Sequence, residues 1–110
     1  MTDSPLGGNL AELLKKAQDL GQQLKLRQDE LAGLRLPVSV GGGMVQMVFN
    51  GKGEALSLHI DPAVANPGEI AVLQDLVLSA VNEGMRQVQQ RQQEAMAKMA
   101  GGFKIPGLTA

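Results

Sequence analysis

Residues 36–60 read LPVSVGGGMVQMVFNGKGEALSLHI, a segment in which apolar side chains alternate around two glycine-rich turns. Alternation with a period of two is typical of strands, and glycine clusters between strands are typical of hairpin turns. With turns at 41–43 and 50–53, the segment predicts three antiparallel strands at about 35–40, 43–50 and 53–60. This short sheet decides the fold, because a long helical pattern lies on each side of it.

The turn Asn50-Gly51-Lys52-Gly53 sets the expected register of the last two strands. If Gly51 and Lys52 form a two-residue loop, Met47 pairs with Leu56. Two apolar triplets then share one face of the sheet: Val45, Met47 and Phe49 with Leu56, Leu58 and Ile60. Pro37 has no backbone N–H to donate, so the first strand is expected at an edge of the sheet.

The flanking helices show start and stop signals. Asn9 and Glu12 match a capping box, and the first helix is expected from Asn9 to near Gly33, with leucines repeating every seven residues as in a coiled coil. The second helix is expected to begin at Pro67, with Asn66 as its cap and Glu69 at its third position, and to end before Gly101-Gly102. The chain therefore predicts an α+β fold with the order α-β-β-β-α.

The two helices are expected to outrun the sheet. At about 1.5 Å per residue, roughly 26 and 34 helical residues span about 39 and 50 Å, whereas a seven-residue strand spans about 23 Å. The surplus apolar surface predicts a homodimer. The helix-one stripe and the mixed strand face of Met44, Val48 and Ala55 are equal candidates for its interface. We expect one domain at 9–101, a flexible tail at 1–8 and a C-terminal tail at 102–110.

Composition argues against several classes of protein. The 110 residues contain no Cys, no Trp or Tyr, and one histidine, so no thiolate site, catalytic constellation, metal site, cofactor site or small-molecule substrate site is predicted. His59 is expected to be structural or exposed. No apolar run approaches the length of a membrane span, and MTDSPLGGN lacks the features of a secretory signal. A cytoplasmic location is expected.

The charge is unevenly distributed. The net charge is −1, but residues 36–83 carry −4 and residues 84–110 carry +3. Local fields matter more than the total for contact with an anionic polymer. The candidate phosphate-contacting residues are the following: Lys15, Lys16, Lys25 and Arg27 in the first helix, Arg86, Arg91 and Lys98 in the second, and Lys104 in the tail. A solvated helix surface is the competing interpretation of these charges.

The sequence resembles the YbaB/EbfC family of small bacterial nucleoid-associated proteins over about residues 9–108. The resemblance is most specific at GGGMV (41–45), VFNGKGE (48–54) and Ile60-Asp61-Pro62. LQDLV (73–77) and the closing Ile105-Pro106-Gly107-Leu108 also match.

The resemblance implies a tweezer-like homodimer whose helical arms bind duplex DNA, with weak sequence preference, in the nucleoid. It implies an influence on nucleoid organisation and gene expression, and no catalytic role. The acidic net charge keeps a second hypothesis open: a protein-interaction scaffold dimer without significant DNA affinity.

Overall fold

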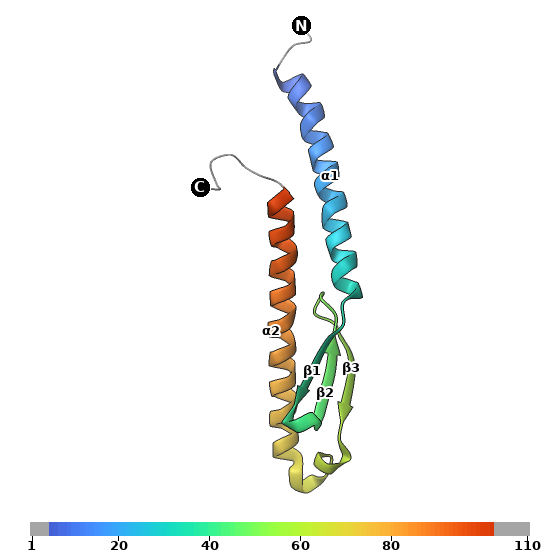
Figure 1. Ribbon diagram of the computed structural model, residues 1–110, viewed down its shortest axis with the longest axis vertical. Helices are drawn as coiled ribbons and strands as arrows, with labels where there is room; N and C mark the ends of the chain where they lie inside the picture. The colour runs from blue at the N-terminus through green and yellow to red at the C-terminus, as the bar shows by residue number, and fades with distance from the viewer. Residues whose placement is uncertain (1–4, 103–110) are drawn as a thin grey trace.

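The computed structural model describes residues 5–102 and shows two long helices joined by a three-stranded antiparallel sheet (Figure 1). The elements, in chain order, are α1 (Pro5–Gly33), β1 (Leu36–Val40), β2 (Val45–Phe49), β3 (Ala55–Ile60) and α2 (Ile70–Gly102). The strand order is β1-β2-β3, so β1 and β3 are both edge strands. The α+β fold and the edge position expected from Pro37 are confirmed.

The molecule is elongated. Its principal extents are 81 × 28 × 17 Å and its radius of gyration is 22.0 Å, against about 13 Å for a compact chain of about 100 residues. The sheet lies against the first half of α2, while α1 and the second half of α2 extend beyond it in the same direction (Figure 1). The helices therefore outrun the sheet, as their lengths predicted.

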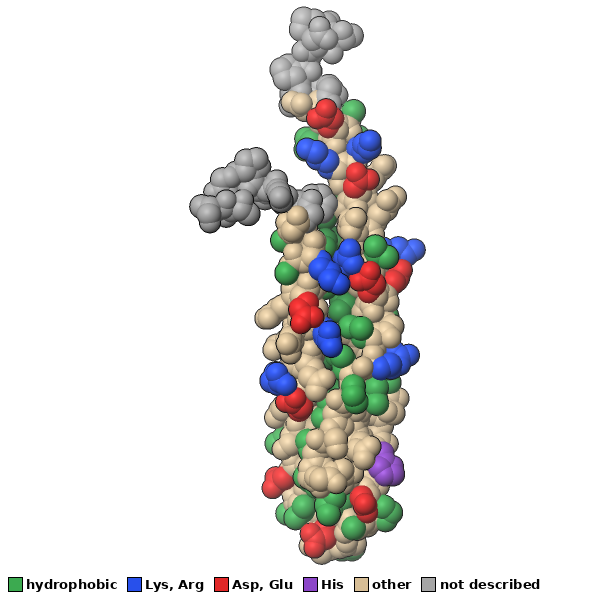
Figure 2. All heavy atoms as spheres, viewed as in Figure 1, with side chains coloured by type: hydrophobic (Ala, Val, Ile, Leu, Met, Phe, Trp, Pro, Cys, Tyr) green, Lys and Arg blue, Asp and Glu red, His purple; other side chains and the backbone are tan. Residues whose placement is uncertain are grey.

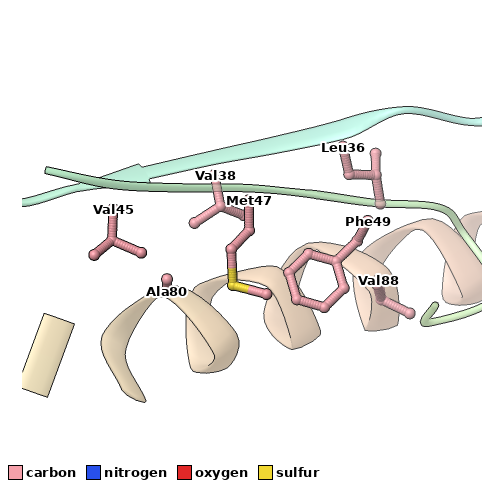
Figure 3. Packing of buried hydrophobic residues seen from close by; sticks show 7 residues of the cluster. All are labelled: Leu36, Val38, Val45, Met47, Phe49, Ala80 and Val88. Atoms are coloured by element: carbon pink, nitrogen blue, oxygen red, sulfur yellow. The ribbon is translucent and has the colours of Figure 1, made fainter. Parts of the chain in front are cut away.

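The core lies between the sheet and the first half of α2. Its buried side chains come from β1, β2 and α2: Leu36, Val38, Val45, Met47, Phe49, Ala80 and Val88 (Figure 3). Gly84 of α2 lies directly under the Phe49 ring, where a β-carbon would overlap the ring. Glycine at this position lets the helix approach the sheet closely enough to bury the aromatic side chain.

The predicted register of β2 and β3 is wrong by two residues. Met47 pairs with Leu58 instead of Leu56. Asn50 closes a longer loop, because its side-chain oxygen accepts from the N–H groups of Lys52 at 3.0 Å and Glu54 at 3.1 Å. A bulge beside Phe49 adds one more residue on the β3 side, and the loop and the bulge together account for the shift.

Of the second predicted apolar triplet, only Ile60 packs against the core. The side chains of Leu56 and Leu58 are exposed and Ile60 is half-buried. The physical reason is width: α2 packs against β1 and β2 but hardly against β3. One strand of the three thus presents apolar side chains to solvent in the protomer.

The helix starts agree in part with expectation. Asn66 caps the start of the second helical segment, since its side-chain oxygen accepts from the Gly68 N–H at 3.1 Å. That segment opens with a 3₁₀ turn, Pro67–Glu69, before α2 proper. The first helix already begins at Pro5, so Asn9 lies inside α1 and the expected cap there is wrong.

Candidate nucleic-acid interface

The two helices border an open groove on the part of the molecule beyond the sheet. This interhelical groove has a volume of about 470 Å³. Its lining residues come from α1, the β2–β3 turn and α2: Leu24, Arg27, Gln28, Leu31, Lys52, Gln92, Ala95, Met96 and Met99. The floor is mainly apolar, and Arg27 and Lys52 supply positive charge.

A single residue of the β2–β3 turn, Gly51, contacts both walls of the groove. The N–H of Gly51 donates to the Leu31 carbonyl at the end of α1, over 2.7 Å. The carbonyl of Gly51 accepts from the Gln92 side chain of α2, over 3.1 Å. A β-carbon on Gly51 would lie 2.8 Å from the Leu31 carbonyl oxygen, so only glycine allows this approach.

The structure brings together three of the predicted basic residues. A smaller hollow of about 110 Å³ next to the groove is lined by Arg27 of α1 and by Arg91 and Lys98 of α2. With Lys52 they form what we call the basic cluster: Arg27, Lys52, Arg91 and Lys98. Figure 2 shows Lys and Arg side chains on both helices around the gap between them.

Two acidic residues partly neutralise the charge of the basic cluster. Arg27 pairs with Glu30 at 2.8 Å, and Arg91 pairs with Glu94 at 3.5 Å. Four positive and two negative charges leave the cluster at +2. Among the side chains that the structure describes, Lys52 and Lys98 have no ion-pair partner within 4 Å. Within the basic cluster, these two ammonium groups are therefore the cations most available to an external anion.

The remaining predicted basic residues do not line the groove. Lys15, Lys16 and Lys25 are exposed elsewhere on α1. Arg86 pairs with Glu83, and this hydrogen bond, followed by one from Gln87, lowers the pKa of the Glu83 carboxyl. Lys104 lies outside the described residues.

Sequence reasoning missed Lys52, Gly51 and Gln92. The sequence assigns Lys52 only to a hairpin turn, because nothing in it shows that this turn lies between the helices. Gln92 is one of several glutamines in the second half of α2, and nothing in the sequence distinguishes it as the one that donates to the turn. The ion pairs could have been predicted from the sequence, since each joins oppositely charged residues three positions apart on one helix.

Other chemistry has little support in the described part of the chain. His59 is exposed on β3, and between residues 5 and 102 no three His, Cys, Asp or Glu side chains gather into a possible metal site. Neither α1 nor α2 has an apolar stretch sufficient to cross a bilayer.

The chain is similar to known proteins over most of its length. Residues 7–103 match the YbaB/EbfC DNA-binding family. A nucleoid-associated protein of Thermoanaerobacter sp. strain X514 is 41% identical over 104 residues, covering 94% of each chain. One from Syntrophobacter fumaroxidans is 43% identical over 102 residues, covering 93% of this chain and 90% of its own.

A solved structure shares the fold. The crystal structure of an uncharacterized Helicobacter pylori protein superposes with a TM-score of 0.60 at 29% identity, covering 90% of this chain and 97% of that one. The family match spans the sheet, both helices and the basic cluster. On these grounds the chain belongs to the YbaB/EbfC DNA-binding family.

Proposed function

We propose that this protein is a nucleoid-associated protein that binds duplex DNA as a homodimer, mainly through phosphate contacts and with weak sequence preference. Membership of a DNA-binding family supports this function, as do the names of relatives that cover nearly the whole chain. The observation that carries the proposal is the basic cluster, which gathers cations from α1, α2 and the β2–β3 turn at one groove.

The chemistry of the basic cluster suits phosphates better than bases. Lys52 and Lys98 are flexible point charges, and lysine contacts to phosphate release counterions without reading sequence. Among the described residues, the only Phe, Tyr or Trp is Phe49, which is buried in the core, and the groove lining contains no aromatic side chain on which a base could stack. Binding is therefore expected to depend steeply on salt and only slightly on DNA sequence.

The other predicted cations extend the surface in this proposal. Lys15, Lys16 and Lys25 continue it along α1. Lys104, outside the described residues, stays a candidate on its charge alone. Arg86 contributes less, because its guanidinium is already paired with Glu83. A homodimer would present the basic cluster twice, and the local field at this cluster matters more for DNA contact than the net charge of −1 per chain.

A mobility-shift titration at two salt concentrations tests the proposal. The Lys52→Glu/Lys98→Glu variant is expected to bind far more weakly, with the log–log salt slope reduced by about 1 for each phosphate that the variant no longer neutralises. The matched variant Lys15→Glu/Lys16→Glu makes the same charge change away from the groove and is expected to lose less affinity. If the two variants behave alike, the groove is not the centre of the interface.

The converse variant sharpens the test. Glu30→Gln with Glu94→Gln removes the counter-charges of Arg27 and Arg91 and is expected to tighten DNA binding. If the native protein shows no shift even at low salt, the DNA-binding proposal fails. The scaffold dimer, which the apolar floor of the groove favours, then becomes the better account.

A further inference from the structure

Lys52 lies in a turn, yet hydrogen bonds hold the backbone around it. Its own N–H donates to the Asn50 side-chain oxygen at 3.0 Å. Asn50 is only 3% exposed, and its side-chain amide donates in turn to the Glu54 carboxylate at 2.7 Å. The preceding residue, Gly51, is buried, whereas the Lys52 side chain is exposed and lines the interhelical groove. The turn therefore presents a mobile charge from a fixed backbone position.

One side chain of α2 completes this arrangement. Gln92 donates to the Gly51 carbonyl at 3.1 Å, and among the described residues this is the only hydrogen bond between α2 and the β2–β3 turn. Without Gln92 the carbonyl of buried Gly51 would lack a donor, which is costly unless the peptide moves toward water. Such a movement would displace Lys52, because Lys52 is the next residue in the chain.

The neighbouring glutamines of α2 have no such contact. Gln89 and Gln93 are exposed like Gln92, and all three line a shallow hollow of about 370 Å³ on α2. Between residues 5 and 102, the structure records no side-chain hydrogen bond for Gln89 or Gln93, and neither lines the interhelical groove. They therefore share the chemistry of Gln92 without its connection to the turn.

We infer that Gln92 is a positioning residue for DNA binding, which keeps Lys52 between α1 and α2 through its hydrogen bond to Gly51. This inference rests on the proposed function of the basic cluster. Gln92 carries no charge, so it acts on the phosphate contact only through Lys52. The competing role is a direct hydrogen bond from Gln92 to DNA, since the side-chain amide has a second N–H.

The salt dependence of DNA binding separates these two roles. The log–log salt slope counts the phosphates that cations neutralise, so the loss of a neutral hydrogen bond leaves it unchanged. Gln92→Ala is instead expected to lower the slope by up to about 1 for each phosphate that Lys52 neutralises. The affinity is expected to fall by up to about fivefold per contact, as for an exposed ion pair. Gln93→Ala, the matched control, is expected to change neither quantity.

A double-mutant cycle tests whether Gln92 acts through Lys52. In a Lys52→Gln background, Gln92→Ala is expected to cause no further loss of affinity or slope, because the cation that it positions is gone. In a Lys98→Gln background the effect of Gln92→Ala is expected to persist, since Lys98 belongs to the basic cluster but lies on α2. Circular dichroism of each full-length variant checks that it is folded.

The outcomes separate this inference from the proposed function. The positioning role is overturned if Gln92→Ala binds DNA like the native protein, or binds more weakly with an unchanged salt slope. Equal losses in the native and Lys52→Gln backgrounds would also overturn it. In each of these cases the native protein still binds DNA and the proposed function stands. A native protein that does not bind DNA even at low salt refutes the proposed function and this inference together.

Discussion

Replacing Gly84 with alanine adds one methyl group at the point where α2 meets the Phe49 ring. The new β-carbon would overlap three carbons of the ring, and the ring cannot move away freely because Phe49 is buried among Met47, Val88 and the other core side chains. Overpacking a core by one carbon costs about 1–3 kcal/mol, while glycine to alanine within a helix gains about 1 kcal/mol. The net expectation is a loss of up to about 2 kcal/mol in the free energy of unfolding.

Gly21 provides the matched control for this substitution. It also lies inside a helix, but no neighbouring atom lies within 4 Å of the position that its β-carbon would take. Gly21→Ala is therefore expected to gain stability by up to about 1 kcal/mol from helix propensity alone. Chemical denaturation of both variants at one protein concentration measures the difference. The reasoning about close packing is refuted if Gly84→Ala is as stable as Gly21→Ala.

Three further changes probe the turn and the charged surface. Asn50→Ala leaves two backbone N–H groups of the turn without their acceptor, and denaturation is expected to show a loss of about 1–3 kcal/mol; an unchanged midpoint would contradict this. Gly51→Ala forces the turn away from α1, so amide hydrogen exchange in the last turn of α1 should quicken, and unchanged protection would count against it. Glu83 has a lowered pKa, so its pairing stabilises the fold above the ordinary glutamate pKa, and this contribution is lost as pH falls through the lowered value. Arg86→Gln should raise the Glu83 pKa in an NMR titration, and no change would show that the ion pair is absent in solution.

Local signals predicted most of the fold. Alternation located the three strands, Pro37 marked an edge, and Asn66 marked the start of the second helical segment. Each of these depends on residues close together in the chain, where propensity and hydrogen-bonding rules act directly.

The register and the extent of the core depended on features that no local pattern specifies. Asn50 closes the loop with its side chain, and a bulge follows, so a two-residue turn was the wrong geometry. Leu58 has the alternation of a core residue, but one helix is too narrow to cover three strands. Its exposure follows from the tertiary arrangement alone.

The candidate site, too, was predictable from the sequence only in part. Arg27, Arg91 and Lys98 are identified by charge, yet their meeting at one hollow depends on how α1 folds back beside α2. Lys52 could not be selected, because its approach to the helices is set by the contact of the turn with Leu31. The assignment of all eight basic residues to DNA stays a prediction until the charge-reversal variants are measured.

Gly51 links the end of α1 to α2 through its two hydrogen bonds, so a change at the β2–β3 turn would tilt α1 relative to α2. The α1 helix extends about 39 Å from this point to its start, at about 1.5 Å per residue. A tilt of about 10° there would carry the far end of α1 through roughly 7 Å relative to α2, by simple geometry on that length. A small change in the two hydrogen bonds of Gly51 would therefore produce a displacement of several ångströms at the distant end of α1.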